Sequence, residues 1–110
     1  MCGIAGIIRF DGSPINLNVL KGMSESLRDR GPDDVGFLGW GKKSSVRLSR
    51  HCETIEGSSI GLLHRRLSIL DRTVAGWQPM GSSDYRYYII FNGEIYNYIE
   101  LKTKLQALGY

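Results

Sequence analysis

Short apolar segments rich in β-branched and aromatic residues recur along this 110-residue chain, and turn signals separate them. Such segments favour β-strands, so the pattern predicts a mainly β fold. The polar stretch Gly41–Ser45 predicts a hairpin loop, and Asp71–Met80, which contains Gly76 and Pro79, predicts an irregular loop. The predicted strands are, in chain order, Ile4–Phe10, Val35–Trp40, Val46–Arg50, Ser59–Ile69 and Tyr85–Phe91.

Two further segments carry apolar residues at helical spacing, one near each end of the chain. Asn16 or Asn18 can cap a helix that runs to about Arg30, where Gly31-Pro32 stops it. Asn97 can cap the second helix, whose apolar face consists of Tyr98, Leu101, Leu105 and Leu108. Strands with helices at the two ends predict a layered α+β fold rather than alternating βαβ units.

The composition is that of an ordinary globular domain, with 42% apolar and 23% charged residues, and it excludes a disordered chain. The net charge of +3 is not clustered, since Lys42-Lys43 and Arg65-Arg66 are the only adjacent basic pairs. We therefore expect no nucleic-acid partner. An apolar run long enough for a bilayer and a signal peptide are both missing, which predicts no membrane partner and a cytoplasmic location. A disulfide between Cys2 and Cys52 is disfavoured there, and no Cys/His spacing indicates a metal.

Cys2 directly follows the initiator Met1. If Met1 is removed, Cys2 carries a thiol and a free α-amino group on one carbon. A thiolate is a strong nucleophile, and an α-amino group, which titrates at about 7.7–8.0, can take the thiol proton. Cys2 is thus a candidate N-terminal nucleophile that holds its own general base. The motif alone also fits an ordinary second residue.

The dipeptide Asn92-Gly93 has two interpretations. One is a hairpin turn, which Asn-Gly often forms. The other is an oxyanion hole, to which Asn92 would give its side-chain amide and Gly93 its backbone N–H. Glycine would also let the backbone approach a substrate closely.

Two neighbouring arginines lie on the predicted strand Ser59–Ile69. Successive side chains on a strand point to opposite faces, so only one of Arg65 and Arg66 can face a site and hold a substrate carboxylate. The alternative is that both are surface charges. His64 is a single histidine in an apolar strand, which favours a core or supporting role over catalysis. Arg30 suits the end of the first helix, or alternatively packs near Cys2.

Four motifs occur in a fixed order and together resemble a known family. They are Met1-Cys2-Gly3-Ile4, Arg30-Gly31-Pro32-Asp33, His64-Arg65-Arg66-Leu67-Ser68-Ile69 and Asn92-Gly93-Glu94-Ile95-Tyr96-Asn97. This set resembles the class II glutamine amidotransferase domain, an N-terminal nucleophile hydrolase, and within it the glutamine-hydrolysing asparagine synthetase family. The segment Gly76-Trp77-Gln78-Pro79-Met80 also looks like a loop of that family. The resemblance covers residues 1–110.

The resemblance implies a four-layer αββα sandwich, of which residues 1–110 would be the N-terminal portion. It also implies a C-terminal synthetase domain, absent here, that uses ATP and Mg to amidate aspartate. We expect no cofactor and no metal in this segment. L-Glutamine would be the substrate, and the synthetase domain would be the partner. A homodimer is a further partner that this resemblance allows. The family's aspartate for the glutamine amino group would lie beyond Tyr110, so we expect a fragment with poor activity alone.

The resemblance also implies roles for individual residues. Cys2 would attack the glutamine side-chain amide and release ammonia, and water would hydrolyse the glutamyl thioester. Asn92 and Gly93 would form the oxyanion hole. The remaining substrate contacts would be Arg66 to the α-carboxylate, Leu67, Ser68, Ile69 and Leu70 as the pocket lining, and Glu94 to the α-amino group. Two alternatives remain, namely the same module serving a sugar or peptide acceptor domain, and a non-catalytic relic.

Overall fold

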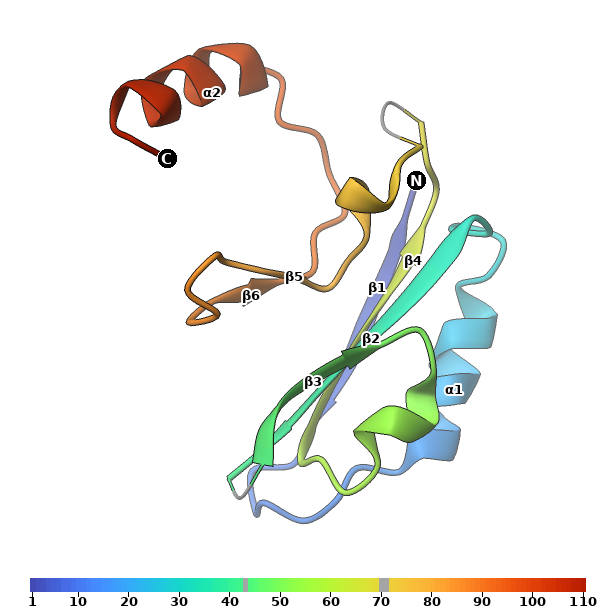
Figure 1. Cartoon of the computed structure of the whole chain (residues 1–110). Coiled ribbons are helices and arrows are strands. Elements are labelled where there is room, and N and C mark those ends of the chain that lie inside the picture. Colours follow the sequence, from blue (N-terminus) through green and yellow to red (C-terminus); the bar gives the residue numbers. More distant parts are fainter. Residues whose placement is uncertain (43, 70–71) are drawn as a thin grey trace.

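The computed structural model describes residues 1–42, 44–69 and 72–110. Its main sheet has four antiparallel strands in the spatial order β1-β4-β2-β3 (Figure 1). These are β1 (Gly3–Ile8), β4 (Ile60–Arg66), β2 (Asp34–Gly41) and β3 (Ser44–Ser49). A small second sheet pairs β5 (Met80–Gly81) with β6 (Tyr88–Ile89). The helices are α1 (Leu17–Ser26) and α2 (Tyr98–Ala107), with 3-10 turns η1 (Cys52–Ile55) and η2 (Val74–Gly76). The predicted α+β class is confirmed.

The hydrophobic core lies between one face of the main sheet and the layer formed by α1 and η1 (Figure 1). Its buried members are Ile15, Leu20, Phe37, Cys52, Ile55 and Leu63. Gly61 of β4 leaves the space for this layer, because a Cβ there would stand 2.2 Å from Ile15 Cδ1. Glycine at this position therefore lets the core side chains of Ile15 and Leu20 pack directly on the central strand.

The first helix begins where the sequence placed it. Asn16 is its N-cap, and its side-chain oxygen accepts the N–H groups of Asn18 at 3.0 Å and Val19 at 3.4 Å. The helix ends at Ser26, four residues before the predicted Arg30. The segment after it forms tight turns instead, which bring the chain to Pro32 and into β2.

Strand β4 forms the centre of the sheet and ends at Arg66, three residues before the predicted end at Ile69. The ladder stops there because the next two N–H groups have side-chain partners. Leu67 donates to Cys2 Sγ, and Ser68 donates to Asp33 Oδ2 at 2.6 Å. The predictions for Ile4–Phe10, Val35–Trp40 and Val46–Arg50 are confirmed within two residues at each end.

The prediction of a strand over Tyr85–Phe91 is wrong except at β6. Tyr85 has a left-handed backbone with φ of 55°, and Tyr87 N–H donates to Ser82 Oγ across a turn. These local turn bonds replace the ladder that β-propensity alone would predict. No strand follows Asn92 in the described part of the chain, so the hairpin interpretation is wrong as well.

The two predicted loops are shorter than expected. Strand β2 runs to Gly41 and β3 starts at Ser44, so both strands extend into the predicted hairpin loop Gly41–Ser45. The loop over Asp71–Met80 contains the turn η2, and its last residue opens β5. Asp71 and Lys43 lie outside the described residues.

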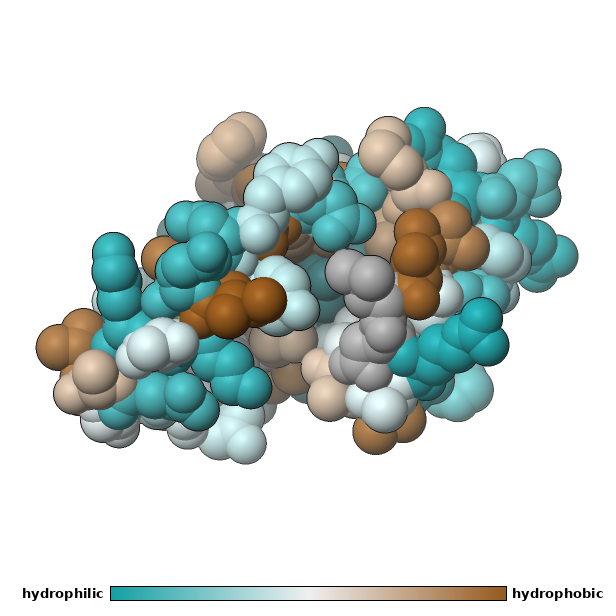
Figure 2. Space-filling model, turned by 90° about the horizontal axis from the view of Figure 1, so that it is seen from above, coloured by the Kyte–Doolittle hydropathy of each residue, from teal (hydrophilic) through white to brown (hydrophobic). Residues whose placement is uncertain are grey.

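Helix α2 stands away from the main sheet (Figure 1). Asn97 is its N-cap residue, as predicted, although its side chain makes no capping bond. All ten residues of the helix are exposed, and apolar side chains stand among hydrophilic ones on that side of the molecule in Figure 2. Among the described residues, no helix has the length and apolar character required to cross a membrane.

Candidate active site

Cys2 lies immediately before β1, at the end of the sheet where the neighbouring strand β4 finishes. The antiparallel register pairs Gly3 with Arg65, so Cys2 comes beside Arg66 and Leu67. Its Sγ accepts the Leu67 N–H at 3.3 Å, and the same Sγ lies 3.7 Å from the Leu67 carbonyl oxygen. Arg30 Nε donates to the Cys2 carbonyl at 3.4 Å, which is the contact expected if Arg30 packs near Cys2.

A cleft of about 240 Å³ opens beside Cys2. It brings together residues that lie up to 93 positions apart in the chain. Every residue that the sequence assigned to the site lines this cleft, except Leu70, which lies outside the described residues. The lining comprises Met1, Cys2, His64, Arg66, Leu67, Ser68, Ile69, Gly76, Gln78, Phe91, Asn92, Gly93 and Glu94.

The two neighbouring arginines of β4 point to opposite faces of the sheet. Arg65 turns to α1, where its Nε donates to Ser24 Oγ at 2.9 Å and its Nη2 to Glu25 Oε1 at 3.1 Å. Arg66 turns to the cleft that Cys2 lines. Both side chains are nearly buried, so neither is a plain surface charge. Arg65 ties the helix to the sheet, and Arg66 is the arginine that faces the candidate nucleophile.

Arg66 is held against the turn η2. Its Nη1 donates to the Thr73 carbonyl oxygen at 2.7 Å. Gly76 completes the contact, since a Cβ there would lie 2.1 Å from Arg66 Nη2. The turn η2 thus contacts the guanidinium at both of its ends, through the Thr73 carbonyl oxygen and the close backbone at Gly76.

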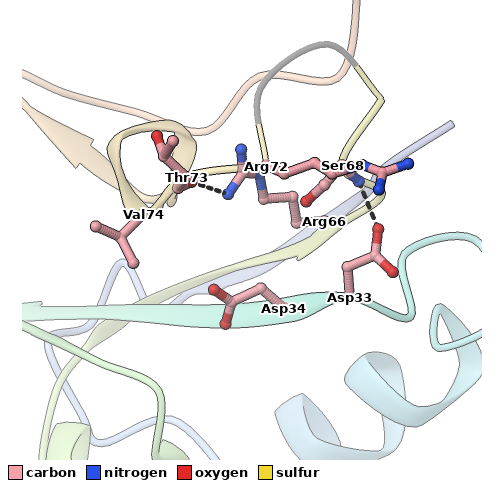
Figure 3. A pocket seen from close by; sticks show the side chains of 7 residues that line it. All are labelled: Asp33, Asp34, Arg66, Ser68, Arg72, Thr73 and Val74. Carbon is pink, nitrogen blue, oxygen red and sulfur yellow. Dashed lines mark hydrogen bonds between the residues drawn. The ribbon is translucent and has the colours of Figure 1, made fainter.

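A second hollow, of about 470 Å³, is drawn in Figure 3 and shares Arg66 and Ser68 with the cleft beside Cys2. Its lining residues are Asp33, Asp34, Arg66, Ser68, Arg72, Thr73 and Val74. Figure 3 shows the bonds from Arg66 to Thr73 and from Ser68 to Asp33 within it. Neither Cys2 nor Asn92 lines this hollow, so the smaller cleft is the candidate active site.

His64 lies in the wall of the cleft and is 1% exposed. Its Nε2 is 3.2 Å from the Phe91 carbonyl oxygen, and its buried Nδ1 has no hydrogen-bond partner among the described residues. Burial lowers the pKa of His64 from its ordinary value, Arg66 adds to the shift, and the Phe91 carbonyl opposes it. His64 is therefore neutral at pH 7 and supports the cleft, as the sequence predicts.

Gln78 is a cleft residue for which the sequence predicted no role. Its Oε1 accepts the Phe91 N–H at 2.6 Å. The only signal in the sequence was that Gln78 belongs to the segment Gly76–Met80. The bond from Phe91 to Gln78 joins two segments that no sequence pattern relates. The described residues contain no group of three or more His, Cys, Asp or Glu side chains suited to a metal ion.

Comparison with known proteins identifies the family of this chain. The chain belongs to the glutamine amidotransferase domain family, whose model matches residues 1–110. It is 41% identical to a putative glutamine-hydrolysing asparagine synthetase of Methanocaldococcus jannaschii, over 94% of this chain. It is 38% identical to asparagine synthetase 1 of Bacillus subtilis over 100% of the chain, and 35% identical to the Zea mays asparagine synthetase over 97%.

The matched relatives are much longer than this chain. The chain covers 20% of the Methanocaldococcus jannaschii protein and 15% of each of the other two. No solved structure matches.

Proposed function

We propose that this domain hydrolyses L-glutamine to glutamate and ammonia, with Cys2 as the nucleophile. The observation that carries the proposal is the cleft beside Cys2, which is also lined by Arg66 and Asn92-Gly93. A thiol, a cation for a carboxylate and two donors for an oxyanion are the parts that amide hydrolysis of an amino acid requires.

The proposed reaction has two steps. With Met1 removed, the α-amino group of Cys2 takes the thiol proton, and the sulfur attacks the glutamine side-chain carbonyl carbon. The Asn92 side-chain amide and the Gly93 N–H stabilise the oxyanion, after which the C–N bond breaks and ammonia leaves with the transferred proton. Water then attacks the glutamyl thioester, which releases glutamate and restores the thiol.

The substrate's α-carboxylate would bind Arg66, whose guanidinium already lies in the cleft wall. Leu67, Ser68 and Ile69 would contact the rest of the amino acid, and the carboxylate of Glu94 would attract its α-ammonium group. Leu70, the next residue in the sequence, is proposed to line the pocket as well.

We further propose that the domain acts within a longer glutamine-hydrolysing asparagine synthetase. The names of the relatives and the short share of their length that the chain covers support this. A synthetase domain would use ATP and Mg and pass the ammonia to aspartate, while this segment needs no cofactor. The complete domain would be a four-layer αββα sandwich, for which the pairing of one helix layer with one face of the main sheet is the supporting observation.

The test is Cys2→Ala in the full-length protein that contains this domain. Glutamine-dependent synthesis and glutaminase activity should be lost, while synthesis from added ammonium should continue, because the acceptor chemistry does not use the thiol. Cys52→Ala is the matched control, since Cys52 is buried in the core and lies outside the cleft.

Mass spectrometry supplies a second readout. The mature protein should begin at Cys2, and a glutamine analogue with an alkylating group at its amide position should modify Cys2 and spare Cys52. Loss of both activities in Cys2→Ala, or retention of Met1 in an active glutaminase, would contradict the proposed division of labour.

A further inference from the structure

The segment that carries the proposed oxyanion donors has little backbone support. Strand β6 ends at Ile89, and α2 begins at Tyr98. Within the described ranges, no backbone–backbone hydrogen bond joins Phe91, Asn92 or Gly93 to another segment. Donors that stabilise a developing charge must nevertheless be held in place before the reaction. Side chains from elsewhere therefore have to position this segment.

Two side chains hold Phe91, one on each of its backbone polar groups. Gln78 Oε1 accepts the Phe91 N–H at 2.6 Å, and His64 Nε2 lies 3.2 Å from the Phe91 carbonyl oxygen. A carbonyl oxygen can only accept, so Nε2 carries the proton and donates it. Both bonds lie one residue before Asn92, and together they fix the backbone on each side of the Phe91 Cα.

Both anchors rest on the central strands of the sheet. His64 of β4 pairs in register with Gly36 of β2, so the two residues share a face. The Gln78 backbone sits directly on Gly36, where a Cβ would stand 1.9 Å from the Gln78 carbonyl oxygen. Trp77 Nε1 secures the same segment by donating to the Val35 carbonyl at 3.0 Å. A site supported by strands is more precise than one supported by loops.

We infer that Gln78 and His64 are positioning residues, which place the Asn92–Gly93 donors by holding Phe91 between them. The inference rests on the proposed function, since it assumes that these donors face an oxyanion formed at Cys2. Neither residue is a catalytic residue here, because each acts through Phe91. The inference predicts a loss in kcat with little change in KM, because the anchors align transition-state contacts rather than the substrate carboxylate.

The test compares Gln78→Met with Gln78→Glu in the full-length protein. Methionine keeps the length of the side chain but cannot accept the Phe91 N–H strongly, whereas a carboxylate can. We expect Gln78→Met to lower the glutaminase kcat by about 100-fold, as for a misplaced reacting group, and to leave KM for glutamine near its original value. Gln78→Glu should keep most of the parent kcat. Gln106→Met on the exposed helix α2 makes the same chemical change away from the cleft and should have no effect.

A second pair covers the other anchor. His64→Gln keeps an N–H that can reach the Phe91 carbonyl, whereas His64→Leu has no donor. We expect His64→Leu to be slower than His64→Gln by about tenfold in kcat, the value of one ordinary hydrogen bond. Ammonium-dependent synthesis and thermal unfolding, measured in parallel, show whether each variant is folded.

The outcomes separate this inference from the proposed function. If Cys2→Ala keeps glutaminase activity, the proposed function fails whatever the Gln78 variants do. If Cys2→Ala is inactive but Gln78→Met is folded and keeps the parent kcat, only the positioning inference is overturned. A folded Gln78→Met that changes KM alone, or a Gln78→Glu that is as slow as Gln78→Met, overturns it too.

Discussion

Arg65 and Arg66 are neighbours in sequence with different surroundings, and the strand geometry accounts for the difference. Arg65 donates to the carbonyl and hydroxyl of Ser24 and to the Glu25 carboxylate. Arg66 lines the cleft and donates to the backbone carbonyl of Thr73. Because successive side chains of a strand point to opposite faces, Arg65 stabilises the fold while Arg66 can contact a substrate.

We predict that Arg66→Ala raises KM for glutamine by about 10- to 100-fold, the loss expected when a charge-assisted contact to a carboxylate disappears. Arg65→Ala should leave KM near its original value. It should instead lower the free energy of unfolding by about 1–3 kcal/mol, because buried acceptors on α1 lose their donor. Steady-state kinetics and urea denaturation check the pair, and equal KM effects would contradict the assignment of faces.

At the level of single residues, the sequence predicted much of the cleft and a supporting role for His64, but not the support from Gln78. Cys2, Arg66 and Asn92-Gly93 could be named because their chemistry is local to short motifs. The bond from Gln78 to Phe91 could not, since it depends on how closely a loop approaches Gly36 in the folded sheet.

Helices and strands followed local signals wherever neighbouring segments agreed with them. The cap at Asn16 and the central strand β4 formed as their sequences indicate. The segment Tyr85–Phe91 did not, although its β-propensity is high. Strand preference depends on a partner strand, and here a turn closed by Ser82 and the left-handed Tyr85 leaves room for two paired residues only.

The cap of α1 gives a prediction at this scale. Asn16→Ala should lower the free energy of unfolding by about 1 kcal/mol, because the N–H groups of Asn18 and Val19 lose their acceptor. Asn16→Asp should restore it. Asn18→Ala is the control, since Asn18 contributes only its backbone N–H to the cap. Urea denaturation would contradict the assignment if the two alanine variants lost equal stability.

The molecule as a whole is more extended than a closed domain of its length. Its radius of gyration is 15.1 Å, against about 13 Å for a compact domain of this size. The principal extents are 43 × 32 × 20 Å. The main sheet packed on α1 forms one end of the molecule, and α2 stands apart from it at the other end (Figure 1). Leu101 and Leu105 of α2 are 40% and 50% exposed, so this helix gains little from burial.

Hydrogen exchange should show this division directly. In the 110-residue chain, the amides of the two central strands, β4 and β2, should exchange most slowly, because each of them is paired on both sides. Those of α2 should exchange close to the rate of an unfolded peptide, since an unsupported helix of ten residues is marginal in water. Protection of α2 equal to that of β4 would contradict the extended arrangement.

The pairing of β1 with β4 has a consequence for substrate length. The register pairs Gly3 with Arg65, so the next residues, Cys2 and Arg66, lie beside each other at the end of the ladder, and both line the cleft. In the proposed mechanism these two groups grip opposite ends of one amino acid. The pairing of these two strands would then favour a substrate of one particular length. We therefore expect asparagine, which is one methylene shorter than glutamine, to be a poor substrate, because its amide would stop short of Cys2 while its carboxylate stays on Arg66.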